Sequence, residues 1–296
     1  MNFELMLLDR IQKIQSINEQ YNLLDNAYLS FSGGKDSLCL HYLLDLALPN
    51  NKIPRLFLNT GLEYLELLTF VKEMAKNDDR IIVLNNKLNI KNTLDTYGYP
   101  FKSKYFSHVI KQFNDGVSME SVNKFLNGEY MLKCPKDLKY IFTAKNVLPF
   151  KVSDLCCYKF KKEPAKKWAK LNNKSIILTG MRKDESGQRA LANCIVTDKD
   201  GNLKKFHPLL VVDEEFENKF FEKYDIKLCK LYYEPYNFKR TGCKGCPFSL
   251  DLQKDLYTMN QLMPNERKQC EFLWKPVYDE YRRINYHLSN NYSIFD

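Results

Sequence analysis

One ten-residue stretch constrains the fold of this chain more than any other part of its sequence. Residues 28–37 read YLSFSGGKDS, so an apolar run is followed directly by a serine, two glycines and Lys-Asp-Ser. Residues 27–31 are predicted to form a short buried strand and residues 36–46 a helix. Two glycines between them let successive backbone N–H groups point into one concavity, to which the helix adds its positive end. The stretch therefore predicts a site for an anion such as pyrophosphate.

The side chains of this stretch suit a nucleotide phosphate. Lys35 supplies a mobile positive charge, Ser32 and Ser37 supply hydroxyls, and Asp36 is placed to help hold Mg²⁺ or to orient the nucleotide. Because Asp36 follows the lysine, the spacing is not that of a Walker A loop, GxxxxGK(S/T). We expect Lys35 and Asp36 to be catalytic. The residues expected to bind the nucleotide are Ser30, Ser32, Gly33, Gly34, Lys35, Asp36 and Ser37.

The order of apolar runs predicts an α/β fold with a Rossmann-like parallel sheet flanked by helices. An amphipathic helix over 3–24 comes first, and strands and helices then alternate at a spacing that is typical of doubly wound sheets. The predicted elements are strand 27–31, helix 36–46, strand 55–58, helix 64–76, strand 80–84, helix 162–171, strand 175–178 and a hairpin of 192–196 with 203–209.

Two parts of the chain fall outside this alternation. From residue 97 to about residue 150, short helical pieces are separated by glycine and proline, which predicts a helical insertion over the edge of the sheet. Beyond residue 236, the sequence predicts a cysteine-bearing loop followed by helices. We therefore expect an α/β domain over 1–235 that carries the phosphate site, with an appendage over 236–296 packed on it.

A second group of candidate residues follows the predicted strand 55–58. Asn59, Thr60, Gly61 and Glu63 lie where that strand ends. In open α/β sheets, ligands bind beyond the carboxyl ends of the strands, so these residues should lie beside the phosphate site. We expect them to line a nucleotide pocket, with Glu63 contacting the ribose or a metal ion. An Asn-Thr-Gly sequence by itself is also an ordinary turn signal.

A third group follows the predicted strand 175–178. Gly180 and Arg182 come at the end of this strand, and Arg189 comes seven residues after Arg182. Arginine binds phosphate or sulfate oxygens with a planar fork, so we expect Arg182 and Arg189 to be catalytic and Gly180 and Arg182 to contact the nucleotide. An exposed charged loop is the alternative. His207 is expected to have a structural role.

Four of the nine cysteines form two close pairs. Cys156 and Cys157 are adjacent, and Cys243 and Cys246 form a CxxC in a glycine-rich stretch. Four thiolates are a complete ligand set for a 4Fe-4S cluster or a structural zinc. Adjacent cysteines are unusual at zinc sites, and the glycines let backbone N–H groups approach the sulfurs, so we favour the cluster over zinc or uninvolved thiols. A disulfide scaffold does not suit a chain of this length without an export signal.

The other five cysteines are expected to have no metal-binding role. Cys39, Cys194 and Cys229 lie among apolar neighbours and are expected to be small core residues. Cys134 and Cys270 are flanked by charged residues and are expected to be accessible to solvent, which makes either one a candidate persulfide carrier.

Taken in order, these motifs resemble one enzyme family. SGGKDS resembles the PP-loop of the adenine nucleotide alpha-hydrolases, and residues 59–63 resemble the (D/N)TG-x-E stretch that lines their adenosine pocket. Residues 180–190 resemble the G(M/I/V)R-x-x-ES-x-x-RA stretch of phosphoadenosine phosphosulfate reductase-like proteins, and CC followed by CxxC resembles the cluster signature of adenylylsulfate reductases. Over about residues 28–248, the chain is thus similar to the reductase-like PP-loop ATP pyrophosphatases. The resemblance implies cleavage of ATP between its α and β phosphates, with sulfur chemistry near a cluster.

Two activities fit this resemblance. Sulfonucleotide reductases usually depart from SGGKDS and carry an ECG-type cysteine motif near the carboxyl terminus, whereas this chain keeps the full loop and ends in SNNYSIFD. We therefore favour ATP-dependent thiolation of a nucleic acid or a small molecule, in which the substrate is adenylated, pyrophosphate leaves and sulfur displaces AMP. A reductase of adenylyl sulfate and a nucleotide-sensing iron-sulfur subunit without turnover are the alternatives.

The net charge of +9 bears on the partners. It permits a polyanion such as DNA or tRNA, although a lysine-rich and asparagine-rich composition explains it equally well. A cysteine desulfurase is a candidate sulfur donor. No apolar run approaches the roughly 20 residues needed to cross a bilayer, and the first residues do not resemble a signal peptide. We expect a cytoplasmic protein without membrane contact.

Overall fold

The computed structural model describes residues 2–130, 132–183 and 192–288. The chain divides into two compact units, each made of two stretches. We call Met1–Asn86 with Glu163–Gly242 the sheet unit, and Lys87–Lys162 with Cys243–Asp296 the cysteine unit. The predicted boundary at residue 235 differs from this division, because the helical insertion groups with the C-terminal helices. Phe101 of the insertion, for example, packs against Tyr281 with ring centroids 5.2 Å apart.

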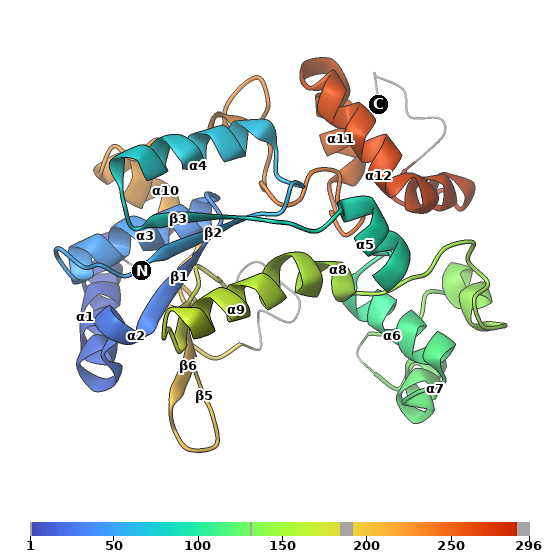
Figure 1. The fold of residues 1–296 in the computed structure, drawn as a ribbon, viewed down its shortest axis with the longest axis horizontal. Coiled ribbons are helices and arrows are strands. Elements are labelled where there is room, and N and C mark those ends of the chain that lie inside the picture. Colours follow the sequence, from blue (N-terminus) through green and yellow to red (C-terminus); the bar gives the residue numbers. More distant parts are fainter. Residues whose placement is uncertain (1, 131, 184–191, 289–296) are drawn as a thin grey trace. The chain divides into compact units, whose positions relative to one another are not determined.

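The sheet unit is built around a six-stranded sheet with the order β3-β2-β1-β4-β6-β5 (Figure 1). Neighbouring strands are parallel except for β5 and β6, which form the predicted antiparallel hairpin. The mainly parallel α/β sheet is therefore confirmed. The strands are β1 (Ala27–Phe31), β2 (Arg55–Asn59), β3 (Ile81–Asn85), β4 (Ile176–Leu178), β5 (Ile195–Thr197) and β6 (Leu203–Phe206).

Helices cover both faces of this sheet (Figure 1). Leu29 and Phe31 of β1 join the larger apolar cluster, which includes the helices of one face. Tyr28 points to the other face, where its ring lies 5.5 Å from that of Trp168. Strands that are apolar on both sides are expected for a sheet with two covered faces. The larger cluster contains residues of α1 (Phe3–Tyr21), α2 (Leu23–Asn26), α3 (Lys35–Ala47), α4 (Leu65–Asn77) and α10 (Glu214–Lys223), and the smaller one contains residues of α9 (Glu163–Leu171).

The predicted first helix, 3–24, is two helices in the structure. Asn22 has a left-handed backbone with φ of 50°, which ends α1. Its side-chain oxygen then accepts a hydrogen bond of 3.4 Å from the backbone N–H of Asp25 and so caps α2. Asparagine tolerates the left-handed region better than most residues, which explains why the interruption falls here.

The cysteine unit is helical, as the insertion and the C-terminal part were predicted to be. Phe106, Phe125 and Phe142 pack edge to face at its centre, with ring centroids 5.9–6.2 Å apart. No helix in the described ranges has both the length and the apolar character to span a membrane. The helices are α5 (Ile90–Tyr97), α6 (Lys104–Asp115), α7 (Met119–Asn127), η1 (Lys136–Phe142), α8 (Leu155–Cys157), η2 (Tyr158–Lys162), α11 (Leu252–Leu262) and α12 (Pro264–Arg283).

Candidate functional site

The glycines of the predicted phosphate loop lie between β1 and α3, as the sequence indicates. Gly33 has a φ of +72°, and a Cβ there would lie 2.5 Å from Val71 Cγ2 of α4. A Cβ on Gly34 would lie 3.1 Å from the hydroxyl of Tyr232. Position 33 therefore requires glycine, because of both its backbone conformation and its contacts. Glycine at position 34 lets the Tyr232 hydroxyl approach the start of α3 closely.

Two serine side chains hold the loop in shape. The Ser37 hydroxyl donates a 3.0 Å hydrogen bond to the carbonyl of Gly34 and accepts one of 3.1 Å from the backbone N–H of Ser32. The hydroxyls of Ser32 and Ser37 lie 2.9 Å apart, and the Ser32 hydroxyl accepts from the N–H of Gly34 at 3.3 Å. These contacts fix the turn through its own side chains, so both serines have a structural role beside the predicted one.

Tyr232 is a residue of this site that the sequence analysis missed. Its hydroxyl accepts a 3.2 Å hydrogen bond from the backbone N–H of Lys35 and lies 2.8 Å from the hydroxyl of Thr241. Burial raises the pKa of Tyr232 to about 12, so the hydroxyl stays neutral. Tyr232 follows Lys35 by almost 200 residues and belongs to the short helix η4 (Lys230–Tyr232), and no local signal in the sequence connects them.

The end of β2 carries the second predicted group. Both carboxylate oxygens of Glu63 accept hydrogen bonds from Thr60, at 2.8 Å from the backbone N–H and at 2.9 and 3.0 Å from the hydroxyl. The Asn59 side chain donates to Asn85 of β3 at 2.9 Å and accepts from the N–H of Gly61 at 3.3 Å. Glu63 thus braces the turn after β2. Its contact with a ribose or a metal ion stays a prediction.

Ser30 occupies an unusual position for a residue of a central strand, because its side chain is exposed. It lies on the same face of the sheet as Tyr28, on the side that α9 covers. Leu58 and Leu84 of the adjoining strands are only half-buried on that face. The carboxyl ends of these strands therefore offer a partly uncovered apolar surface next to the loop.

The end of β4 approaches the first turn of α3 closely. A Cβ on Gly180 would lie 2.6 Å from the carbonyl carbon of Asp36, so only glycine fits without a shift of the backbone. Arg182, which is 8 % exposed, donates to Asp36 Oδ1 at 3.1 Å, and its Nε also lies 3.6 Å from the fully buried carboxylate of Glu217. Arg182 is thereby fixed beside the loop. Arg189, predicted to act with it, lies outside the described residues.

Two other side chains near the loop have defined partners. Lys35 Nζ lies 3.4 Å from a carboxylate oxygen of Glu214 and 5.2 Å from the centre of the Tyr232 ring. His207 is buried, and its Nδ1 lies 2.6 Å from the Thr179 hydroxyl at the end of β4. Burial lowers the pKa of His207, which favours the neutral ring. The prediction of a structural role for His207 agrees with these contacts.

The four paired cysteines all belong to the cysteine unit. The Sγ atoms of Cys156 and Cys157 are 4.0 Å apart. A hydrogen bond to Cys157 and burial raise the pKa of Cys156, and the charges of Cys157, Cys246 and Cys243 raise it further. Two cysteines about 85 residues beyond the pair in the sequence thus lie near enough to act on it electrostatically.

Cys157 has the opposite shift. The hydrogen bond from Cys156 lowers the pKa of Cys157 to about 6 against burial, and Lys104, Lys161 and Lys162 lower it further. Burial and Cys243 raise the pKa of Cys246, while the backbone N–H of Phe248 and the charge of Lys161 oppose the rise. Lysines and a backbone N–H therefore surround the sulfurs with groups that stabilise thiolates.

The CxxC loop is held by aromatic side chains of α12 that the sequence analysis did not identify. The indole N–H of Trp274 donates to the carbonyl of Lys244 at 3.2 Å, the hydroxyl of Tyr278 donates to the carbonyl of Gly245, and that of Tyr281 donates to the carbonyl of Pro247 at 2.9 Å. These three residues are spaced four and three apart, so they share one face of the helix. The backbone of the loop is therefore held in place by side chains of α12.

The four paired cysteines and the groups around them have the chemistry that the predicted cluster requires. Four thiols gather in one unit, the CxxC backbone is fixed, and a loop N–H and several lysines compensate negative charge on sulfur. In a cluster each thiolate binds a different iron, whereas a tetrahedral zinc would need all four sulfurs about 3.8 Å apart. Across residues 2–130, 132–183 and 192–288, no three or more His, Cys, Asp or Glu side chains are already arranged to hold a metal ion.

The structure corrects the prediction that Cys134 and Cys270 are accessible. Cys134 is 6 % exposed and Cys270 is fully buried, where it would contact a Cβ on Gly245 at 2.7 Å. Burial raises the pKa of both thiols, to about 12 for Cys270. The neighbouring Lys133 and Lys268 are exposed although the thiols are buried, and a buried neutral thiol is a poor persulfide carrier. Cys39 and Cys229 are buried and Cys194 is half-buried.

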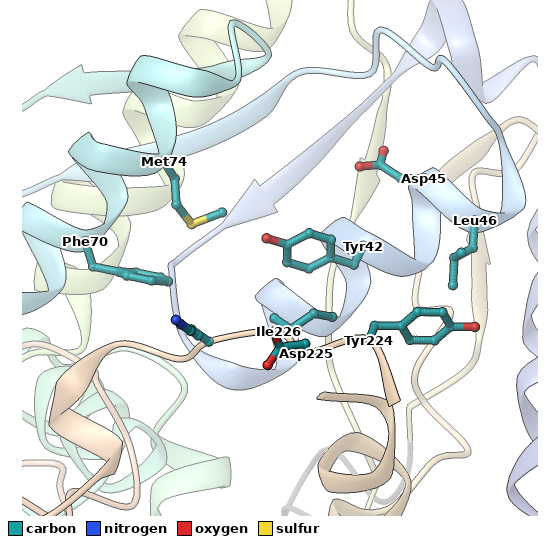
Figure 2. A pocket seen from close by; sticks show the side chains of 9 residues that line it. Tyr42, Asp45, Leu46, Phe70, Met74, Tyr224, Asp225 and Ile226 are labelled. Carbon is teal, nitrogen blue, oxygen red and sulfur yellow. The ribbon is translucent and has the colours of Figure 1, made fainter. Parts of the chain in front are cut away.

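A groove of about 490 Å³ lies elsewhere on the sheet unit (Figure 2). Tyr42 and Leu46 from the second half of α3 face Phe70 and Met74 of α4, and Tyr224 closes one side. None of the predicted site residues lines this groove, because the phosphate loop lies at the opposite end of α3.

Solved structures of other proteins resemble this chain distantly. A phosphoadenylyl-sulfate reductase from Candida auris is 15 % identical, covers 74 % of this chain and 81 % of its own, and gives a TM-score of 0.43. A U34-tRNA thiolase with its 4Fe-4S cluster from Methanococcus maripaludis is 15 % identical in sequence. The match covers 99 % of this chain and 84 % of the thiolase chain, with a TM-score of 0.41. An FMN adenylyltransferase from Candida glabrata is 14 % identical in sequence. The match covers 82 % of this chain and 63 % of the adenylyltransferase chain, with a TM-score of 0.46. With TM-scores below 0.5, none of these likenesses bears on activity.

Sequence comparison is more decisive. An uncharacterized protein of Methanocaldococcus jannaschii is 32 % identical over 103 residues, which are 32 % of this chain and 25 % of that protein. The chain thus spans about a quarter of the length of this relative. The sequence model of the phosphoadenosine phosphosulfate reductase domain matches residues 26–129 and 130–249, which include both the phosphate loop and all four paired cysteines. The chain therefore belongs to the phosphoadenosine phosphosulfate reductase domain family.

Proposed function

We propose that this protein is an ATP pyrophosphatase-type sulfurtransferase, which adenylates its substrate with release of pyrophosphate and promotes the insertion of sulfur with a 4Fe-4S cluster. The observation that carries the proposal is the geometry at the start of α3. There, glycines in restricted space and Arg182, bonded to Asp36, form an anion site within a chain of the reductase family. An intact loop of this kind is suited to a pyrophosphate that has to be held as it leaves.

In the first step, an oxygen of the acceptor attacks the α phosphorus of ATP, and the bond from that phosphorus to the bridging oxygen breaks. Backbone N–H groups of the loop and Lys35 neutralise the charge that builds on the departing pyrophosphate, and Asp36 would help to hold Mg²⁺, which would supply further positive charge. Arg182 holds the α phosphate or an anionic substrate, and we assign the same role to Arg189. In the second step, the sulfur of hydrosulfide attacks the activated centre of the acceptor, the bond from that centre to the oxygen of AMP breaks, and AMP leaves with that oxygen. A persulfide would instead leave the acceptor joined to the donor cysteine by a disulfide, which a second thiol would have to reduce.

The nucleoside part of ATP would lie along the carboxyl ends of β1 and β2. Ser30 is exposed there beside half-buried leucines, which suits the flat face of an adenine. Asn59, Thr60 and Gly61 form the adjoining turn, and Glu63 holds that turn in place. Gly180 lets the end of β4 pack closely against the first turn of α3, and we propose that the nucleotide lies beside this contact.

Sulfur chemistry is assigned to the cysteine unit. Cys156, Cys157, Cys243 and Cys246 would hold the cluster, and sulfide would bind to one of its irons by replacing a cysteine thiolate. The sulfur donor that we propose is a persulfide protein such as a cysteine desulfurase, and the acceptors that we propose are DNA, tRNA or a small molecule. The free thiols suit a reducing compartment, so we propose that the protein is cytoplasmic.

Reduction of a sulfonucleotide is the second candidate, because the matching family is described by that activity. In that case the anion site would hold the sulfate or phosphate of adenylyl sulfate, and no pyrophosphate would be released. Sulfite production from adenylyl sulfate with a thiol reductant would select this activity over thiolation.

The proposal is tested by anaerobic purification, with iron and sulfide analysis followed by assays of pyrophosphate release from ATP. Lys35→Ala should keep the brown colour and lose pyrophosphate release, because Lys35 belongs to the loop. Cys243→Ala should lose the colour and still bind ATP. If both changes remove the colour equally, or if the wild type releases no pyrophosphate with any candidate acceptor, the proposed division of roles is wrong.

A further inference from the structure

The positive charge of this protein is concentrated in one part of the chain. Residues 87–162, which we call the lysine segment, contain 14 lysines and six acidic residues, a net charge of +8. The other 220 residues contain 31 basic and 30 acidic residues. A bias of composition would spread the excess over the whole chain. The concentration therefore argues against composition as its cause and for a local surface with a function.

Much of this charge is not neutralised by neighbouring carboxylates. Three of the 14 lysines, Lys91, Lys111 and Lys124, are paired with acidic residues four positions away on their own helices. Lys133, Lys136, Lys139 and Lys145 are exposed, and in the part of the chain that the structure describes no carboxylate forms an ion pair with them. Uncompensated lysines on an exposed surface attract phosphates and release counterions when they bind them.

The lysines extend across several elements of the cysteine unit. The positive charges of Lys139 in η1 and Lys102 before α6 both lower the pKa of Cys134. The charges of Lys104 at the start of α6 and of Lys161 and Lys162 in η2 lower the pKa of Cys157. A single sulfate or phosphate engages only a few such groups. A positive surface of this extent suits a chain of phosphates instead.

Exposed aromatic side chains lie among these lysines. Tyr97 at the end of α5 is 36 % exposed and Tyr158 at the start of η2 is 37 % exposed. Lys159 Nζ lies 4.5 Å from the centre of the Tyr97 ring, which brings a charge and a ring together beside the cysteine pair. Lysines interleaved with aromatic rings are typical of proteins that bind single-stranded nucleic acids, whose bases stack on the rings.

We propose that the lysine segment binds a single-stranded stretch of nucleic acid, with its phosphates on the lysines and its bases against Tyr97 and Tyr158. That this nucleic acid is the acceptor of sulfur rests on the proposed function, and it selects a nucleic acid over a small molecule. Binding of the strand itself needs neither ATP nor a cluster, so it can be tested alone.

The test is binding of a fluorescein-labelled 20-nucleotide polythymidine strand, measured by fluorescence anisotropy at several salt concentrations without ATP. Binding to the wild type should weaken steeply with salt, by about 0.7 in log K per log salt for each phosphate contacted. Changing Lys133, Lys136, Lys139 and Lys145 together to glutamine should lower that slope by about 3 and weaken binding at low salt at least tenfold.

A matched control removes the same charge from the sheet unit. Lys52, Lys72, Lys76 and Lys199 are exposed, and their joint change to glutamine should leave the slope nearly unchanged. Thermal unfolding of both variants checks that each is folded. Equal loss of binding in both variants, or a wild type whose binding does not depend on salt, overturns the inference.

Two further probes separate the partners. A strand of abasic units with the same number of phosphates should bind about tenfold more weakly with an unchanged slope, because stacking is lost. Equal binding of the abasic strand overturns the role of the tyrosines. Polyglutamate that competes as well as polythymidine at equal charge overturns the nucleic acid in favour of an acidic protein. Pyrophosphate assays on the same preparations show whether the proposed function fails independently.

Discussion

The Nε of Arg182 donates a hydrogen bond of 3.1 Å to Oδ1 of Asp36 and thereby joins the end of β4 to the first turn of α3. The two residues are separated by 146 positions in the sequence. Their contact puts an arginine and a carboxylate beside the predicted phosphate loop, where we propose that the arginine holds an anion and the carboxylate a metal ion.

Arg182→Gln should lower both nucleotide binding and stability. Arg182 also lies 3.6 Å from the fully buried carboxylate of Glu217, and removing one partner of a buried ion pair costs about 3 kcal/mol. Urea unfolding measures this loss. The double variant Arg182→Gln with Glu217→Gln should recover most of the stability without recovering ATP binding. Unchanged stability of the single variant would show that Glu217 does not depend on Arg182.

Gly180→Ala should destabilise the sheet unit and weaken ATP binding. The new methyl group would lie 2.6 Å from the carbonyl carbon of Asp36, so the start of α3 has to shift, at a cost of about 1–3 kcal/mol. Gly242→Ala is the matched control, because no atom lies within 4 Å of its Cβ position. Calorimetric titration with a non-hydrolysable ATP analogue and urea unfolding should separate the two variants, and identical behaviour would contradict the close packing of β4 on α3.

Tyr278→Phe should loosen the CxxC loop. The change removes the hydroxyl that donates to the buried carbonyl of Gly245, which costs about 1–3 kcal/mol when the carbonyl is left without a partner. The measurements are urea unfolding and iron bound per chain after anaerobic reconstitution. Phe272→Leu, on the exposed side of the same helix, should change neither quantity. A Tyr278→Phe protein with wild-type stability would show that the helix does not hold the loop.

His41 should make the stability of the protein depend on pH. Burial and the nearby charge of Arg55 lower the pKa of His41 to about 4 in the folded state, whereas its ordinary value is about 6.5. Between these values the unfolded chain binds a proton that the folded protein does not, so stability falls as the pH is lowered from about 6.5 to 4. The loss for this group is up to about 3 kcal/mol.

Urea unfolding at pH 7 and at pH 5 measures this effect. His41→Gln carries no titrating ring and should lose less stability than the wild type over the same range, although it starts from a lower value because the ring nitrogen accepts a hydrogen bond from buried Arg55 at 3.2 Å. Parallel pH profiles of the two proteins would assign the dependence to other groups.

The local parts of this protein could be predicted from its residues alone. Strand β1, the glycine turn and helix α3 could be predicted because a short apolar run, helical periodicity and the need for glycine are properties of adjacent residues. The family followed from the same stretches, and the matching model covers residues 26–129 and 130–249. The positive charge of the lysine segment can also be counted in the sequence, but the net charge of +9 for the whole chain does not show that it is concentrated there.

The contacts between residues far apart in the sequence could not be predicted and became visible in the folded chain. Tyr232 binds the N–H of Lys35, α12 holds the CxxC loop with Trp274 and Tyr278, and the insertion joins the C-terminal helices. The fold also buries Cys270, whose charged sequence neighbours had indicated exposure. Such contacts depend on how the chain folds back over a hundred or more residues, and side-chain packing at that distance leaves no periodic signal in the sequence.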